Sequence, residues 1–161
     1  METIDYINLG VIMKNAFTMI ELIFVIVIIG ILAAIAIPKL SATRDDAKVS
    51  VLANNIKEIA NELTAYAISQ NVIKNNIRDM SNVLDSMIIQ RYATQIDNST
   101  INFKAGAISD CIILKKISGN GDVNITIDFN SNNTDNICKS LQRTIDTSRF
   151  PIPLRGARIK K

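Results

Sequence analysis

The side chain in this sequence with the clearest potential for chemistry is a carboxylate at the start of a hydrophobic run. Glu21 is followed by sixteen residues, 22–37, that carry no charge. A carboxylate costs about 2.5 kcal/mol or more at the centre of a bilayer, and less near its edge. Glu21 is therefore either a tolerated residue at the membrane interface or a group that is kept to contact something else.

Catalysis has little support elsewhere in the 161 residues. The chain has no histidine, which removes the commonest general base and zinc ligand. It has no nucleophile paired with a base and no glycine-rich loop for phosphate. Asp122, Asp128 and Asp135 match no calcium-binding loop. We expect neither an enzyme nor a metal site, and no cofactor.

The two cysteines, Cys111 and Cys138, lie in the polar half of the chain. If that half is exported, a disulfide is favoured over two free thiols. Closing a loop of about 28 residues would stabilise a small domain by roughly 3.6 kcal/mol. A redox or metal pair would need closer spacing or further ligands.

The hydrophobic run is long enough to span a membrane. Residues 17–38 form about 22 residues, or some 33 Å of helix. The run is too long for a typical cleaved signal peptide, and no small-x-small cleavage site follows it. Lys14 favours retention of the N-terminal side in the cytoplasm. We expect a retained single-pass membrane anchor, with the cysteines on the exported side.

Residues 14–38, from Lys-Asn-Ala-Phe-Thr-Met-Ile-Glu-Leu to Ile-Ala-Ile-Pro, resemble the cleavage and methylation motif of type IV prepilins and pseudopilins. The resemblance covers about 25 residues. It implies that prepilin peptidase cuts between Ala16 and Phe17 and that Phe17 is then N-methylated. The family usually has glycine before the cut, and Ala16 is small enough to take that place. Glu21 would then pair with the new ammonium of Phe17, within the subunit or in a neighbour.

The resemblance also predicts three parts of the chain. Residues 1–16 would be the leader, with translation starting at Met13, because Met13-Lys14-Asn15-Ala16 is an ordinary short basic leader. Residues 17–38 would be the transmembrane and assembly helix, and residues 39–161 the exported pilin-like domain. Gly30 and Pro38 weaken helical continuity, so the segment between them could stretch in a filament, although both residues are also common in membrane helices.

The exported part should begin with the continuation of the same helix. Apolar residues recur at spacings of three and four, which predicts one helix over about residues 18–70: Val49, Leu52, Ile56, Ile59, Leu63 and Tyr66. A free coiled coil is the alternative, but the pattern fades before a fourth heptad.

Beyond this helix, residues 71–77 should form a loop, and Asn82 could cap a second helix that reaches Ile96. Strands over 108–117 and 122–129 flank a Ser-Gly-Asn-Gly turn, which is typical of a hairpin. With the resemblance, this order indicates an α+β, pilin-like fold in which a long N-terminal helix packs on a small antiparallel sheet.

The C-terminal tail carries five cations and no acid after Asp146: Arg149, Arg155, Arg158, Lys160 and Lys161. Such a tail could contact DNA phosphates, although basic ends are usually just solvated.

The interpretation that fits best is a structural subunit of a type II secretion or type IV pilus-like pseudopilus, polymerised to move protein or DNA across the envelope. Its expected partners are prepilin peptidase, other pilin-like subunits, and an assembly platform with its ATPase. The alternative is an anchored periplasmic binding module that does not polymerise.

Overall fold

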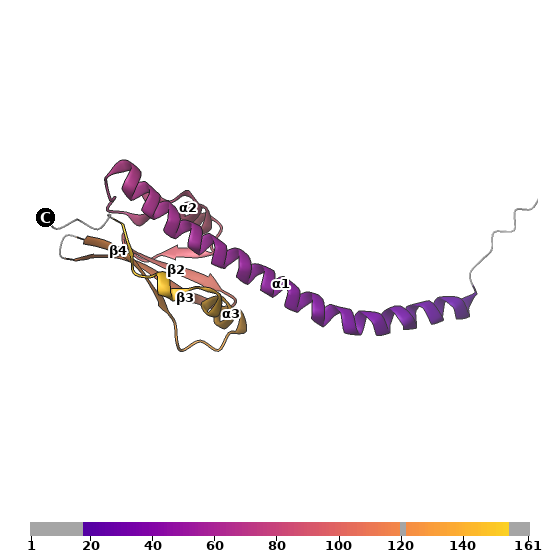
Figure 1. Ribbon diagram of the computed structural model, residues 1–161. Helices are drawn as coiled ribbons and strands as arrows, with labels where there is room; N and C mark the ends of the chain where they lie inside the picture. The colour runs from indigo at the N-terminus through magenta and orange to yellow at the C-terminus, as the bar shows by residue number, and fades with distance from the viewer. Residues whose placement is uncertain (1–17, 120–121, 155–161) are drawn as a thin grey trace, which may run out of the picture. The chain divides into compact units, whose positions relative to one another are not determined.

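The computed structural model describes residues 18–119 and 122–154 (Figure 1). The chain forms two compact units, of which the first ends at Ser41 and the second begins at Ala42. The first helix, α1, runs from Met19 to Gln70 and contributes to both. This confirms the predicted long helix. It ends where Asn71 takes a left-handed conformation at φ 49°, a position that asparagine tolerates better than most residues.

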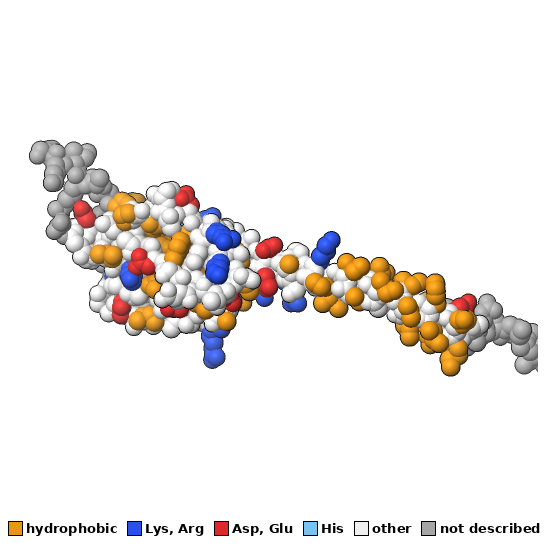
Figure 2. All heavy atoms as spheres, turned by 90° about the horizontal axis from the view of Figure 1, so that it is seen from below, with side chains coloured by type: hydrophobic (Ala, Val, Ile, Leu, Met, Phe, Trp, Pro, Cys, Tyr) orange, Lys and Arg blue, Asp and Glu red, His pale blue; other side chains and the backbone are white. Residues whose placement is uncertain are grey.

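In the first unit, α1 is apolar on every side. Its large apolar side chains from Met19 to Leu40 are 42% to 80% exposed, and Figure 2 shows them gathered along the helix. Within the described residues, α1 is the one helix long and apolar enough to cross a membrane. A helix that is hydrophobic all round needs lipid or other helices as its surroundings.

The second unit has α+β architecture, as predicted. After α1 come a 3₁₀-helix η1 (Ile77–Met80) and helix α2 (Asn82–Ile89). Four strands follow, which are β1 (Ala93–Gln95), β2 (Thr100–Ala105), β3 (Ile108–Gly119) and β4 (Asp122–Phe129). Helix α3 (Asn136–Thr144), the 3₁₀-helix η2 (Thr147–Arg149) and strand β5 (Ile152–Pro153) complete the described part.

The five strands form one antiparallel sheet in the order β1-β2-β3-β4-β5. The longest pairing joins β3 to β4, from Ile112 opposite Phe129 to Gly119 opposite Asp122. This confirms the predicted hairpin, with β3 two residues longer than expected. The register between β2 and β3 shifts between Phe103 and Ala105, so the pairing is irregular there.

The core of this unit lies between α1 and the sheet. The predicted helical seam is buried, from Val49 to Leu63, and Tyr66 at its end is half-buried. Opposite the helix, Ile101 and Phe103 of β2 and Leu114 of β3 are fully buried. Burying such side chains is worth about 1.5–3 kcal/mol each, so the part of α1 from Ala42 onward is the structural spine of the unit.

The prediction for the second helix was wrong at both of its ends. Ser81, not Asn82, is the N-cap, because its hydroxyl accepts a hydrogen bond from the N–H of Leu84. The helix ends at Ile89 instead of Ile96. Arg91 adopts φ 63°, its N–H bonds to Ile88, and the N–H of Tyr92 bonds to Met87. This is a Schellman motif with arginine where glycine is usual, so the sequence carried no ordinary stop signal.

Three strands and one helix were missed by the sequence prediction. Strands β1 and β5 have only three and two residues, and such short strands exist only because a longer strand lies beside them. Strand β2 did carry a signal, since Ile101, Phe103 and Ala105 alternate with polar residues. Helix α3 was also signalled, by Asp135 as its N-cap.

Candidate functional site

The candidate assembly site is the start of α1, where Thr18 and Glu21 cap the helix reciprocally. The Thr18 N–H and hydroxyl both donate to Glu21 Oε2, at 2.8 Å each. In return, Thr18 Oγ1 accepts a hydrogen bond from the Glu21 N–H at 3.3 Å. This is a capping box, which satisfies two backbone donors that a helix start otherwise leaves unpaired.

The capping box gives the carboxylate a defined place and a use. The positive end of the helix dipole favours a negative charge in the first turn. Both bonds from Thr18 are to Oε2, so Oε1 is left to accept from another group. A carboxylate that is already partly satisfied by its own helix costs less to bring to the membrane edge than a bare one. Glu21 can therefore hold a charge there and still receive a cation.

The predicted cut between Ala16 and Phe17 lies outside the described residues, so its geometry stays a prediction. A cut at that bond would leave the Phe17–Thr18 amide intact, and the Thr18 N–H would still donate to Glu21. Gly30 and Pro38 both lie inside α1, which continues through them. Proline removes one backbone N–H from the helix, so this region has fewer bonds to hold it.

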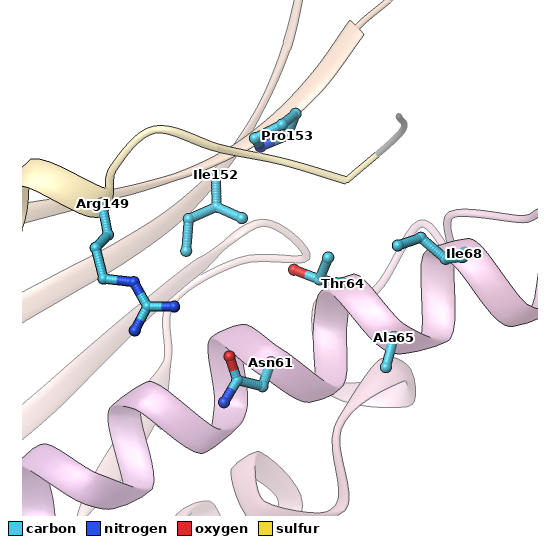
Figure 3. A pocket seen from close by; sticks show the side chains of 7 residues that line it. All are labelled: Asn61, Thr64, Ala65, Ile68, Arg149, Ile152 and Pro153. Atoms are coloured by element: carbon cyan, nitrogen blue, oxygen red, sulfur yellow. The ribbon is translucent and has the colours of Figure 1, made fainter. Parts of the chain in front are cut away.

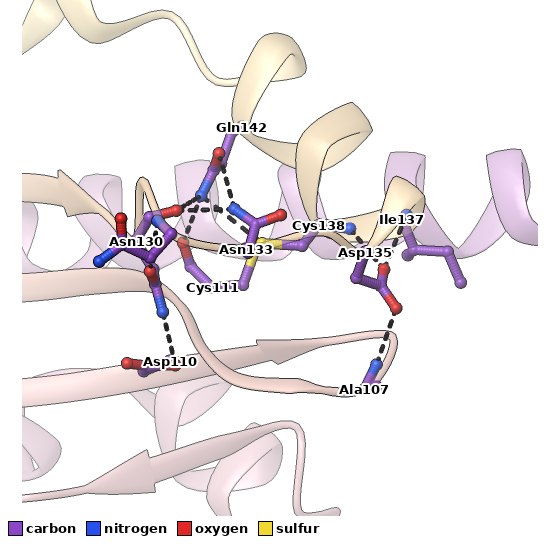
Figure 4. Close-up of a disulfide and its surroundings, with 10 residues drawn as sticks. Ala107, Asp110, Cys111, Asn130, Asn133, Asp135, Ile137, Cys138 and Gln142 are labelled. Atoms are coloured by element: carbon purple, nitrogen blue, oxygen red, sulfur yellow. Dashed lines mark hydrogen bonds between the residues drawn. A yellow bond between two sulfur atoms is a disulfide. The ribbon is translucent and has the colours of Figure 1, made fainter.

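The disulfide lies at the junction of β3 and α3 (Figure 4). Cys111 and Cys138 are bonded with an S–S distance of 2.02 Å, and both are fully buried. Gln142 reinforces the junction, because its Nε2 donates to the carbonyls of Cys111 (2.9 Å) and Asn130 (3.0 Å). The predicted disulfide is thus present, and it ties α3 to β3 just beyond the end of the pairing between β3 and β4.

Asp135 connects the start of α3 to the turn between β2 and β3. Its Oδ1 accepts from the N–H groups of Ile137 (2.8 Å) and Cys138 (3.0 Å), and its Oδ2 accepts from the N–H of Ala107 at 3.1 Å. The hydrogen bonds from Cys138 and Ala107 lower the pKa of this carboxyl. Gly106 makes the approach possible, since a Cβ there would clash with the Asp135 carboxylate.

A second carboxylate holds α1 to the start of α2. Glu62 Oε2 accepts from the hydroxyl of Ser81 at 2.6 Å and from the N–H of Val83 at 3.1 Å. Ser81 is 5% exposed, so these bonds are shielded from water. Glu62 is therefore a structural contact and not a candidate acid catalyst.

Of the five cations considered for DNA contact, the structure places only one. Arg149 is at the end of η2, and Arg155, Arg158, Lys160 and Lys161 lie outside the described residues. Among the described residues, no group of three or more acidic or cysteine side chains is placed to hold a metal ion. Asp135 is occupied as a helix cap, and Asp128 pairs with Lys115 at 2.6 Å.

Sequence reasoning missed the role of Thr18, although the signal was present. Thr18-Met19-Ile20-Glu21 fits the capping-box pattern Ser/Thr-x-x-Glu before an apolar run. Asp135 was considered only as an oxygen ligand. Its role as a helix cap could have been predicted from its position before an amphipathic stretch. Its contact with Ala107 could not have been predicted, because 28 residues separate the two.

Comparison with known proteins adds to this geometry. Residues 13–37 match the family described as the prokaryotic N-terminal methylation motif. Over 53 residues the chain is 45% identical to the type II secretion system core protein G of Pseudomonas aeruginosa. That match covers 33% of this chain and 37% of the relative, so it spans about a third of each. No solved structure matches. The chain thus carries the prepilin-type N-terminal methylation motif, joined to an α+β domain with a long helix on a small antiparallel sheet.

Proposed function

We propose that this chain is a structural subunit of a type II secretion-like pseudopilus. Prepilin peptidase would cut it between Ala16 and Phe17, and Phe17 would be N-methylated. The processed chain would wait in the inner membrane with its domain on the periplasmic side. An assembly platform and its ATPase would then polymerise it with other pilin-like subunits. The similarity to a core protein of type II secretion favours protein as the cargo over DNA.

The observation that carries this proposal is the capped carboxylate at the entrance of an all-round apolar helix. A membrane anchor needs the apolar residues but has no need of Glu21. A capping box stabilises a helix start by about 0.5–2 kcal/mol, and glutamine would serve in it as well as glutamate. The helix dipole favours this charge by only about 0.3–1 kcal/mol, which leaves room for a second use. The proposed cut would supply a partner, because it would create an ammonium at Phe17, four residues earlier.

The ammonium and the carboxylate together can align neighbouring subunits. In a low-dielectric bundle of helices, an ion pair adds little net stability, but a charge without its partner costs several kcal/mol. Alignments of neighbouring helices that leave Glu21 without a cation are therefore strongly disfavoured. Gly30 and Pro38 would let the helix adjust in length as the bundle packs, since both weaken the backbone bonds around them.

Substitution of Glu21 by glutamine tests the proposal. The variant keeps the hydrogen bonds from Thr18 and removes only the charge. We expect a stable, membrane-inserted and processed protein that does not enter filaments in cells that express its assembly machinery. Processing is measured by intact mass, and assembly by the amount of sheared filament.

The matched control is Glu58→Gln, which removes an exposed carboxylate from the other half of α1 and should assemble normally. The alternative function, an anchored binding module, predicts that Glu21→Gln is fully functional, because removal of a charge favours insertion. A normal amount of filament from the Glu21→Gln variant would contradict the proposed assembly role of Glu21.

A further inference from the structure

A groove runs along the exported half of α1, between this helix and the segment that leads into β5 (Figure 3). Its volume is about 450 Å³, and it is lined by Asn61, Thr64, Ala65, Ile68, Arg149, Ile152 and Pro153. A smaller cavity of about 150 Å³ adjoins it, sharing Asn61, Arg149 and Ile152 and adding Lys57 and Asp146. We call this combined surface the α1–β5 groove. All of it lies within the second unit.

The α1–β5 groove combines apolar walls with two cations at one end. Figure 3 shows the Arg149 side chain reaching toward α1 on the side of Asn61. Arg149 and Lys57 are exposed, and neither has an ion-pair partner within 4 Å among the described residues. Asp146 is the one acid among the residues that line the groove. It accepts from the N–H and hydroxyl of Ser148, and these bonds together with the charges of Arg149 and Lys57 lower its pKa. The groove therefore carries a net charge of +1 from these three groups, and it suits an acidic partner.

The charge of the groove selects among possible occupants. The chain's own C-terminal residues 155–161 contain four cations and no acid, so like charges would oppose them. A candidate acid lies elsewhere in the second unit. Asp46 of α1 is exposed, and its carboxylate has no ion-pair partner among the described residues. Neighbouring Asp45 is paired with Lys48 at 3.0 Å.

We propose that the α1–β5 groove is a subunit interface, in which a second copy of this chain places its Asp46 against Arg149 and Lys57. This inference rests on the proposed pseudopilus function and names one contact within it. Arginine holds a carboxylate through two parallel hydrogen bonds, which fixes the orientation of the partner. The apolar walls at Ala65 and Ile68 then have the neighbour's helix to cover them.

The positions of the charges along α1 also predict an axial offset between the α1 helices of neighbouring copies. Anchored copies share one orientation, so their α1 helices run parallel. Asp46 precedes Lys57 by eleven residues, which is about 16 Å along a helix. Copies without an offset would set Lys57 beside Lys57, whereas an offset of about that length sets Asp46 beside the cations. Because donor and groove are different patches of one chain, the contact leaves a free groove on each new copy and generates an open assembly.

Cysteine cross-linking of full-length chains tests this contact in the assembled state. One copy carries Asp46→Cys, and a second copy with a size tag carries Arg149→Cys. Both are expressed with the assembly machinery and then oxidised. We expect a mixed dimer of intermediate size, at least about tenfold more abundant than the dimer from a matched pair in which Lys104→Cys, at an exposed cation on β2 outside the groove, replaces Arg149→Cys. Introducing Glu21→Gln into both copies should remove the mixed dimer together with the filaments.

A charge exchange provides the second measurement. Asp46→Arg and Arg149→Asp should each reduce sheared filaments at least about tenfold, and the double variant should restore them. Intact Cys111–Cys138 disulfide in each variant shows that the domain is folded. If filaments depend on Glu21 but the mixed dimer is no more abundant than its Lys104→Cys control, the groove contact is wrong while the proposed function stands. If filaments do not depend on Glu21, the proposed function fails and this inference fails with it.

Discussion

Replacing Asp135 with alanine should loosen the whole junction between α3 and the sheet. The carboxylate caps α3 through the N–H groups of Ile137 and Cys138 and also holds the N–H of Ala107. Loss of a helix cap costs about 0.5–2 kcal/mol, and loss of one further hydrogen bond about 0.5–1.5 kcal/mol. Asp135 is only half-buried, so we take the middle of these ranges and expect a loss of about 1.5–3 kcal/mol.

Urea unfolding of the full-length chain in detergent, followed by tyrosine fluorescence, measures this loss. With a slope of about 2 kcal/mol per molar urea, the midpoint should fall by about 1 M. Asp122→Ala is the matched control, because Asp122 is an exposed acid at the start of β4. Asp135→Asn should lie between the two, since its amide oxygen can still cap α3 but its NH₂ group cannot accept from Ala107. Equal midpoints for Asp135→Ala and Asp122→Ala would refute the reasoning.

The stability that Asp135 contributes should depend on pH. The hydrogen bonds from Cys138 and Ala107 lower the pKa of Asp135 in the folded state. A carboxyl with a lowered pKa contributes stability above its unfolded value of about 3.9 and loses that contribution as the pH falls through its folded value. The difference between wild type and Asp135→Ala should therefore shrink as the pH is lowered from about 6 to about 3. A difference that stays constant over this range would contradict the assignment.

Three further changes probe the second unit. Gly106→Ala should destabilise it by about 1–3 kcal/mol in the same urea titration, because the residue has φ 59° and the added Cβ would meet the Asp135 carboxylate. Glu62→Ala should cost about 1–3 kcal/mol by leaving the buried Ser81 hydroxyl without its acceptor, whereas Glu58→Ala on the same helix should be nearly neutral. Serine in place of both disulfide cysteines should cost about 3.6 kcal/mol by loop entropy, and reduction of the wild type under denaturing conditions should reproduce that loss.

Much of the fold followed from local pattern. The long helix was predictable because its apolar residues recur with helical spacing from Val49 to Leu63, and the seam is the face that the sheet buries. The β3–β4 hairpin was predictable because apolar and polar residues alternate strictly along β4 and the glycine-containing sequence Ser-Gly-Asn-Gly precedes it. The end of α2 was not predictable, since Arg91 takes the left-handed conformation without being glycine or asparagine.

The candidate functional residues also include some that local sequence predicted and some that it could not. Glu21 was found because a charge before sixteen uncharged residues is conspicuous, and its partner Thr18 was available from the capping-box spacing. The α1–β5 groove was not available, because Lys57 and Arg149 come from segments 92 positions apart that only the folded chain brings to one cavity. Asp146 was read as the end of the acidic part of the chain, and the structure shows it capping η2.

The sequence by itself determined the features that depend on neighbours within a few residues. These are the apolar helix with its carboxylate, the methylation motif, the helical seam and the hairpin turn. Hydrophobicity, capping and turn conformation are set over one or two turns of chain, so they can be read locally. Only the tertiary structure decided the order of the five strands, the bond from Asp135 to Ala107 and the groove beside α1. Those features depend on contacts between segments that are distant in the sequence, and such contacts form only when the elements pack together in the folded chain.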